Sequence, residues 1–228
     1  MYKPNLDKTL DKSIRKKHKK VLSLISHHKK NFKVLGFKIN VQKKAFPPCP
    51  DSIILANFLS KIKNVDSSLD MGTGSGIQAL VLSKKSKKVL AVDINPYAIK
   101  SIEENIRINQ IKNIEAKQSN VFSNVKEKFD LIVFNPPFRY FKPKSLLEKA
   151  MTDHNYTSLT SFFKNARKHL NKNGKIYLIF SNSGDLAYLE GLIKNNRFSS
   201  KIIKRVYSQL LGWDIKELKN YYIIYEIK

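Results

Sequence analysis

The chain is poor in acidic residues, in cysteine and in long apolar runs, and each of these shortages limits what the protein can be. Its 228 residues include 18 Asp and Glu against 43 Lys and Arg, which gives a formal net charge of +25 at pH 7. The single cysteine, Cys49, excludes an internal disulfide and suits a reducing compartment. No run of about 18 apolar residues is present, and the Lys-rich N-terminus lacks the apolar segment of a secretory signal. We therefore expect a cytoplasmic protein with no membrane partner.

Histidine offers no metal site either. The five histidines show no metal-ligand spacing with cysteine or with acidic residues. His27 and His28 are adjacent, but they lie in a basic segment where solvation is the simpler interpretation. The sequence predicts that the protein holds no metal ion.

The excess of basic residues favours a polyanionic partner such as nucleic acid. An alternative stays open, because lysine outnumbers arginine 37 to 6 and asparagine is abundant at 20. AT-rich codon usage would produce the same bias and would spread lysine over every solvated face.

The N-terminal segment carries a large part of this charge. Residues 1–44 hold 14 Lys and Arg against two Asp. Apolar residues recur there at helical spacing and predict one or two amphipathic helices with a Lys-rich outer face. Alternation from Phe32 to Val41 predicts a short strand or hairpin. The segment is either a substrate-docking arm or a cover for the core domain.

Glycine is scarce, yet three of the eight glycines fall at alternate positions in Leu69-Asp70-Met71-Gly72-Thr73-Gly74-Ser75-Gly76-Ile77. An apolar strand precedes them and an apolar helical pattern follows. Glycines allow positive φ and a close approach of a ligand to the main chain, and the free N–H groups of the first helical turn face the same point. Taken alone, the motif is also compatible with a tight turn that binds nothing.

Two later stretches favour a binding site. Val89 to Asp93 is an apolar run that ends in an acid 23 residues after Asp70, about where a ribose-binding carboxylate is expected. Phe129 to Asn135 reads as a buried strand that ends in Asn135-Pro136-Pro137-Phe138.

These three motifs, in this order, resemble those of the class I S-adenosylmethionine (SAM) methyltransferases. Asn-Pro-Pro-Tyr or Asn-Pro-Pro-Phe after the fourth strand is the signature of members that methylate planar amino groups: guanine N2, adenine N6 and the side-chain amide of protein glutamine. The chain is similar to the small-domain branch of that family over residues 46–228. Residues 1–45 would be a basic, largely helical extension.

The resemblance implies an α/β fold, with a Rossmann-like seven-stranded, mostly parallel sheet, helices on both faces and an antiparallel last strand. The alternation of strand and helix patterns agrees with it. Four local expectations can be checked. They are a helix over 53–62 capped by Asp51 or Ser52, a helix over 156–170, a turn at Asn173-Gly174 before a strand over 175–180, and a hairpin connection over 208–220 with Trp213 as a packing residue.

The resemblance also implies the cofactor, S-adenosyl-L-methionine, and the residues that hold it. These are Asp70, Gly72, Thr73, Gly74, Gly76, Asp93, Ile94, Asn120, Val121 and Asn135. The glycine backbone would lie against the cofactor, Asp70 would orient the turn and the cofactor's amino end, and Asp93 would accept both ribose hydroxyl protons. Asn120 would hydrogen-bond to the adenine amino group, and Ile94 and Val121 would pack on the two faces of the adenine ring. The alternative is that Asn120 only caps the next short helix.

The catalytic set implied by the resemblance is Asn135, Pro136, Pro137 and Phe138. The Asn135 side-chain carbonyl and the Pro136 backbone carbonyl would accept the two protons of the target amine and stabilise the charge that develops on nitrogen. Pro137 would make the turn rigid, and Phe138 would offer a stacking face.

The leading functional interpretation is an N-methyltransferase acting on an exocyclic amine of a nucleobase in RNA, guanine N2 or adenine N6. The alternative is a protein-glutamine N5 methyltransferase acting on a translation factor or ribosomal protein. A non-catalytic SAM- or RNA-binding module is disfavoured by the intact Asp70, Asp93 and Asn135. A dinucleotide-dependent oxidoreductase is disfavoured because the G-x-G-x-x-G spacing is absent.

Overall fold

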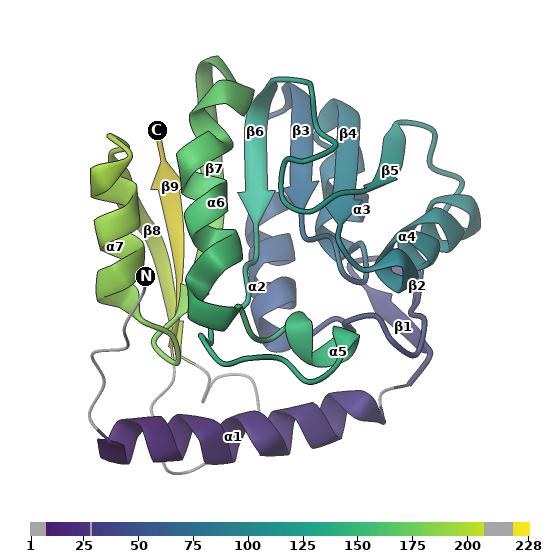
Figure 1. The fold of residues 1–228 in the computed structure, drawn as a ribbon. Coiled ribbons are helices and arrows are strands. Elements are labelled where there is room, and N and C mark those ends of the chain that lie inside the picture. Colours follow the sequence, from purple (N-terminus) through teal and green to yellow (C-terminus); the bar gives the residue numbers. More distant parts are fainter. Residues whose placement is uncertain (1–7, 28, 208–220) are drawn as a thin grey trace.

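A computed structural model describes residues 8–27, 29–207 and 221–228 (Figure 1). The helices are α1 (Lys8–Ser26), α2 (Pro50–Leu59), α3 (Ile77–Ser83), α4 (Pro96–Ile108), α5 (Leu146–Lys149), α6 (Thr157–Ala166) and α7 (Leu186–Asn195), with 3₁₀ turns η1 (His154–Tyr156) and η2 (Arg167–His169). The strands are β1 (Asn31–Val34), β2 (Phe37–Asn40), β3 (Val65–Met71), β4 (Ser86–Asp93), β5 (Ile114–Gln118), β6 (Phe129–Phe134), β7 (Leu170–Ser181), β8 (Ser200–Tyr207) and β9 (Tyr221–Ile227).

The main sheet has seven strands in the order β5-β4-β3-β6-β7-β9-β8. All pairs from β5 to β7 are parallel, whereas β9 runs antiparallel to both β7 and β8. The expected α/β class, the strand number and the antiparallel last strand are confirmed. Since the strand order reverses between β3 and β6, a crevice is expected at the carboxyl ends of these two strands.

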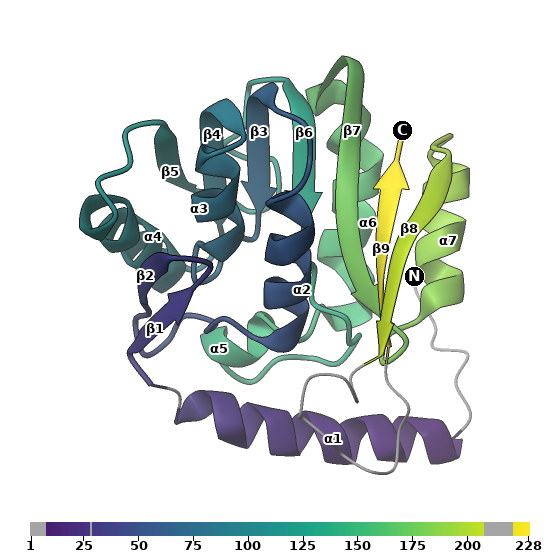
Figure 2. The ribbon, with the colours of Figure 1, turned by 180° about the vertical axis from the view of Figure 1, so that it is seen from behind.

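Helices cover both faces of the sheet, as predicted. α6 and α7 pack on one face, while α2, α3 and α4 pack on the other (Figures 1 and 2). Alternate residues of one strand therefore enter different cores: Ile132 joins the α6 side, and Leu131 and Val133 join the α2–α3 side. This two-sided burial explains why β6 reads as a continuous apolar run.

α1 is a single long helix that crosses the carboxyl edge of the parallel strands (Figures 1 and 2). Its buried residues Ile14, His18 and Ile25 lie at helical spacing, and the remaining described side chains are half-buried or exposed. The hairpin expected over 32–41 is confirmed as β1–β2, and Asn105 of α4 holds it by hydrogen bonds to the backbone of Asn40.

Several local expectations were wrong. α2 begins at Pro50, so neither Asp51 nor Ser52 is its cap. Cys49 holds that position, and its N–H donates to Ser52 Oγ at 2.8 Å. The reason is that proline, with φ already fixed and no N–H to satisfy, fits the first helical turn.

The chain between 139 and 181 also differs from expectation. α6 ends at Ala166, because η2 tightens the last turn before β7. Asn173-Gly174 lies within the bounds of β7, but residues 171–174 pair with no residue of β6, since the register passes from Leu170 opposite Phe129 to Lys175 opposite Leu131. A Cβ on Gly174 would lie 3.1 Å from the backbone of Asn171, so the chain bends at the expected turn and regular pairing begins at Lys175. The polar segment 139–155 contains α5 and η1. The expected hairpin over 208–220, with Trp213, lies outside the described residues.

Asp70 and the three glycines shape the turn between β3 and α3. Gly72, Gly74 and Gly76 all have positive φ. The buried Asp70 Oδ2 accepts hydrogen bonds from Thr73 Oγ1 at 2.6 Å and from Ala79 N at 3.1 Å, so it ties the turn to the helix. At Gly76 a Cβ atom would overlap Ile102 Cδ1 and lie 3.2 Å from Ile102 Cβ, so any side chain there would force Ile102 to shift.

In residues 8–27, 29–207 and 221–228, no helix combines the length and apolar character that crossing a membrane requires. In the same residues, no group of three or more His, Cys, Asp or Glu side chains is placed to hold a metal ion.

Replacing Gly76 by alanine should destabilise the protein by about 2 to 4 kcal/mol, because positive φ and overpacking against Ile102 both act on the new side chain. Urea unfolding measures this loss. Gly191→Ala in α7 is the matched control: a Cβ there meets nothing within 4 Å. It should leave stability unchanged or raise it by about 0.5 to 1 kcal/mol. Equal changes in the free energy of unfolding for Gly76→Ala and Gly191→Ala would contradict the overpacking against Ile102.

Burial raises the pKa of Asp70 from its ordinary 3.8 to about 7, against the opposing hydrogen bonds from Thr73 and Ala79. The folded protein therefore holds this proton more tightly than the unfolded chain, so stability falls as pH rises through this window. Asp70→Asn keeps the acceptor oxygen without the charge. Its melting temperature relative to wild type should rise between about pH 4.5 and 8. The exposed Asp66→Asn is the control. A difference in melting temperature between Asp70→Asn and wild type that does not change with pH would contradict the raised pKa of Asp70.

Candidate functional site

A cavity of about 1060 Å³ opens at the crevice between β3 and β6. Its walls come from the glycine turn, from the residues that follow β4, β5 and β6, from the 46–52 segment, and from α1 and α5. Cavities for a single drug-sized ligand are typically about 300 to 1,000 Å³. This one therefore has room for a nucleoside cofactor and part of a second molecule.

Most of the residues predicted for the site line this cavity. They are Gly72, Thr73, Gly74, Asp93, Ile94, Asn120, Val121, Asn135, Pro136, Pro137 and Phe138. Asp70 and Gly76 are not among the lining residues. Asp70 acts on the turn from behind through Thr73 and Ala79, and Gly76 packs on Ile102.

Asp93 lies at the end of β4 with its carboxylate facing the glycine turn. Oδ2 accepts from Gly74 N at 2.9 Å, and Oδ1 accepts from Asn95 N at 2.8 Å. Each oxygen keeps a second lone pair, so the pair can still accept two hydroxyl protons. Burial raises the pKa of Asp93, and the backbone hydrogen bonds oppose that rise. This geometry fits the ribose of a nucleoside cofactor.

Asn120 and Val121 follow β5 in a tight turn at the cavity wall. The side chain of Asn120 is exposed, and Val121 has φ +52°. That conformation is unusual for a β-branched residue, and Ser119 Oγ supports it by donating to Val121 O at 2.7 Å. Within the fully described 119–128 segment a turn and no helix follows Asn120, so the capping alternative is wrong.

The side-chain amide of Asn135 is the most informative group in the cavity. Its Nδ2 donates to Asp51 Oδ2 at 2.7 Å. A carboxylate oxygen that is not protonated can only accept, so the amide must turn its nitrogen to Asp51. Asn135 Oδ1 is then left buried without a hydrogen-bond partner within the described residues. An unsatisfied buried acceptor is costly, and in a cavity wall it indicates a missing ligand donor.

Asp51 is a site residue that sequence reasoning missed. It is 8 % exposed, and burial raises its pKa, opposed first by the hydrogen bond from Asn135. An acid just after a proline and before an apolar run also suits the first turn of a helix. Nothing in the local sequence therefore distinguished a helix-capping role of Asp51 from its hydrogen bond with Asn135, which lies 84 positions away.

Phe138 is held by aromatic neighbours. Its ring packs edge-on against Phe180 at a centroid distance of 5.4 Å and tilts against Tyr222 at 6.1 Å. Its backbone oxygen accepts from Tyr156 Oη at 2.7 Å. The half-buried ring therefore presents a fixed surface to the cavity.

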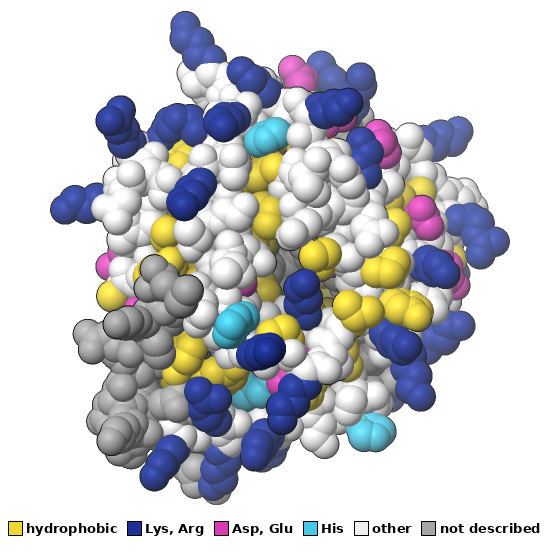
Figure 3. Space-filling view, in the orientation of Figure 1, with side chains coloured by type: hydrophobic (Ala, Val, Ile, Leu, Met, Phe, Trp, Pro, Cys, Tyr) yellow, Lys and Arg dark blue, Asp and Glu magenta, His cyan; other side chains and the backbone are white. Residues whose placement is uncertain are grey.

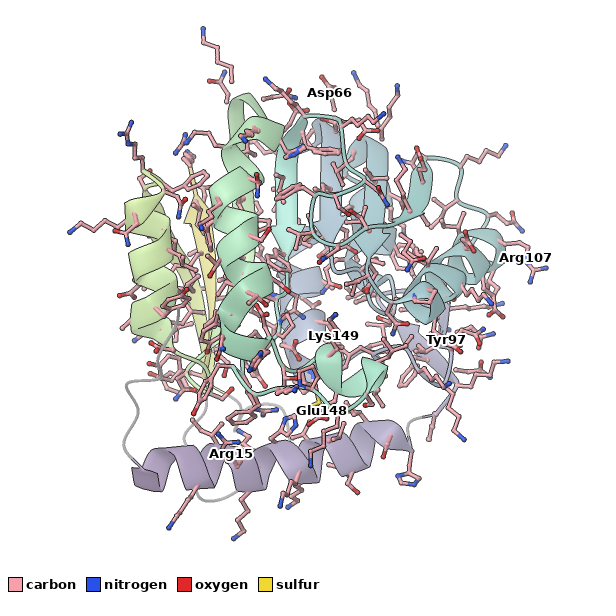
Figure 4. The ribbon with its side chains drawn as sticks, viewed as in Figure 1. Arg15, Asp66, Tyr97, Arg107, Glu148 and Lys149 are labelled. Atoms are coloured by element: carbon pink, nitrogen blue, oxygen red, sulfur yellow. The ribbon has the colours of Figure 1, made fainter. Side chains whose placement is uncertain are left out.

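A second missed cluster ties α1 to the chain after Phe138. Arg139 Nη1 donates to His18 Nδ1 at 3.0 Å, so His18 Nε2 carries the proton that it donates to Glu148 Oε1 at 2.8 Å. Burial lowers the pKa of His18, which agrees with this neutral form. In Figure 4, Glu148 lies between α5 and α1. His18 lies on the buried face of α1, and nothing local in the sequence pointed to its distant partners, which lie 121 and 130 positions away.

Arg139 lines the cavity and is 7 % exposed. Burial lowers its pKa to about 10, so its guanidinium stays charged at neutral pH. Its Nε is buried and makes no hydrogen bond within the described residues. The cavity thus contains a second unsatisfied group, which is a cationic donor.

Comparison with known proteins agrees with the motifs. The family model described as "Methyltransferase small domain" matches residues 50–201. A putative protein N5-glutamine methyltransferase of Methanocaldococcus jannaschii is 42% identical over 104 residues, which are 45% of this chain and 52% of that protein. The release factor glutamine methyltransferase of Lactococcus lactis is 29% identical over 197 residues, 78% of this chain and 70% of the relative.

A third relative acts on RNA by its name. The tRNA1(Val) (adenine(37)-N6)-methyltransferase of Haemophilus influenzae is 29% identical over 153 residues, 63% of this chain and 65% of that protein. This chain spans about half the length of the Methanocaldococcus jannaschii relative, so the similarity covers only part of that protein.

The family match runs over well more than half of the chain and includes the glycine turn, Asp93 and the Asn135 motif. Sheet order, cavity position and motif placement agree with it. The chain belongs to the methyltransferase small domain family, and the cofactor that this family match supports is S-adenosyl-L-methionine.

Proposed function

We propose that this enzyme transfers a methyl group to a planar amino nitrogen. The observation that carries the proposal is the buried Oδ1 of Asn135, which has no partner among the described residues. An amino group needs an acceptor for its protons, whereas a ring nitrogen or carbon nucleophile without a proton has nothing to donate to such an oxygen. The hydrogen bond from Asn135 Nδ2 to Asp51 fixes the orientation of the amide group. The Asn135 Oδ1 therefore does not face Asp51.

The residues that hold the cofactor follow from the same geometry. The backbone of Gly72 and Gly74 would lie against it, Asp93 would bind the ribose, and Asn120 would bind the adenine ring beside Ile94 and Val121. The cofactor supplies an electrophilic methyl group on its sulfonium. No strong base is required of the protein, because its contribution is to position and polarise the nucleophile.

Asn135 and Pro136 perform that positioning. The Asn135 Oδ1 and the Pro136 carbonyl accept the two amine protons and stabilise the positive charge that develops on nitrogen. The fixed ring torsions of Pro136 and Pro137 keep these acceptors in place. Phe138 supplies an aromatic surface for a planar substrate group.

We favour an exocyclic amine of an RNA base as the acceptor. The charge of +25 and the lysines around the cavity support this choice. A glutamine amide of a translation protein is the second candidate, because two of the relatives bear that activity in their names. We also propose that the enzyme works in the cytoplasm and that residues 46–228 form its catalytic domain behind the extension 1–45.

Asn135→Ala should lower kcat by about 100- to 1,000-fold, because it removes an acceptor that stabilises the developing charge. Asp51→Asn should lower kcat by up to about 100-fold, since its amide no longer dictates the orientation of Asn135. The measurement is steady-state methyl transfer, with SAM affinity determined by calorimetry.

Asp51→Asn should bind SAM as the wild type does, because Asp51 is not among the residues that would hold the cofactor. Asn57→Ala, an exposed change on the same helix as Asp51, is the control and should retain full kcat. Wild-type kcat in Asn135→Ala would remove the basis for an amino acceptor.

Methyl transfer from labelled SAM to separated RNA, DNA and protein fractions of a cell extract should label RNA. The label should vanish with Asn135→Ala, and nucleoside analysis would then identify the base. Asn135-dependent label in a protein band would instead establish the glutamine candidate.

A further inference from the structure

α1 presents two chemically different faces. Ile14, His18 and Ile25 are buried against the domain, whereas Lys12, Lys16, Lys19 and Lys20 are exposed. No acidic residue occurs between positions 12 and 30. We call these four exposed lysines the α1 lysine row. In Figure 3 basic side chains gather along this lower edge of the molecule.

The α1 lysine row has a regular spacing. Lys12, Lys16 and Lys20 repeat every four residues, about 6 Å apart along the helix axis. A polyanion lying along α1 would therefore meet a series of positive charges on one face, and its binding would release the counterions of its own phosphates.

The row leads into the cavity. Lys17, Lys20 and Lys29 line it from α1 and the residues that follow, and Lys142 and Lys149 line it from the α5 side. The three acids in the lining, Asp51, Asp93 and Asp153, are buried or half-buried and engaged in hydrogen bonds. The exposed charge at the entrance is thus entirely basic within the lining residues.

Deeper in the cavity, Arg139 offers an anchor for one anionic group. Its buried guanidinium has an Nε without a partner among the described residues, and it follows Phe138 directly in the chain. Planar guanidinium groups match phosphate oxygens well. The neighbouring wall is apolar, with Val21, Leu24 and Phe46. Such a wall suits the face of a base better than a glutamine amide.

We infer that the α1 lysine row and Arg139 form the docking surface for a single-stranded RNA segment. The row binds its phosphate backbone, and Arg139 binds the phosphate beside the base that enters the cavity. This inference rests on the proposed function only for the choice of acceptor base. The surface itself is defined by charge and position.

The test measures binding of a fluorescein-labelled, mixed-sequence single-stranded RNA to the full chain, over a range of salt concentrations and without SAM. The variant Lys12→Gln, Lys16→Gln, Lys19→Gln, Lys20→Gln should bind about tenfold or more weakly near 0.1 M salt. The slope of log affinity against log salt should become shallower by about 0.7 for each phosphate that the variant no longer neutralises.

The matched control removes four exposed lysines at the opposite, amino-terminal edge of the strands: Lys63→Gln, Lys126→Gln, Lys128→Gln, Lys172→Gln. It lowers the net charge equally and should keep most of the affinity and slope. Equal losses in the two variants would show that only diffuse charge attracts RNA, and would overturn the proposal. Wild-type affinity in the α1 variant would overturn it as well.

Arg139→Lys tests the inner anchor, since it keeps the charge but not the planar fork. Weaker RNA binding at an unchanged melting temperature supports the anchor, and unchanged binding overturns it. Asn135→Ala should bind RNA as the wild type does. If the wild-type chain methylates no amino group, the proposed function is wrong. The comparison of RNA binding between the α1 variant and the control variant would still show whether the docking surface exists.

Discussion

The hydrogen bond between Asn135 and Asp51 is the contact on which the rest of the site depends. It joins the end of β6 to the first turn of α2, and it leaves the Asn135 Oδ1 buried without a hydrogen-bond partner among the described residues. A buried carboxylate is expensive, and α2 reduces that cost because Asp51 lies in its first turn, where backbone N–H groups and the helix dipole favour negative charge. The start of α2 at Pro50, a few residues earlier than its apolar pattern suggests, is therefore part of the catalytic geometry.

The parallel sheet explains why the cofactor residues and the acceptor residues share one cavity. Parallel strands end at the same edge, so the glycine turn after β3, Asp93 after β4 and Asn135 after β6 meet there although they are far apart in the chain. Asp70 and Asp93 both approach the glycine turn with raised pKa values, Asp70 mainly through burial and partly because Asp93 is near. Two buried acids around one turn form a site that a cationic cofactor would stabilise.

Local patterns predicted the parts of this structure that local physics determines. Apolar periodicity found the strands and α1, and the three glycines found the turn, because steric limits on φ act on single residues. The turn signal of Asn173-Gly174 was also local: residues 171–174 lie within the bounds of β7 but leave the pairing with β6, which resumes at Lys175. Asp51, Arg139 and the link between His18 and Glu148 could not be found this way. Their roles arise from contacts between residues 84 to 130 positions apart.

The attachment of α1 has a consequence for how the enzyme would meet a large substrate. Only Ile14 and Ile25 are fully buried apolar anchors on the described side chains of α1, and the polar contacts of His18 supply much of the remaining connection. An element with little apolar burial opens at lower free energy than the core. A polyanion bound both along α1 and in the cavity would hold the helix over the cavity, so docking would also close the site.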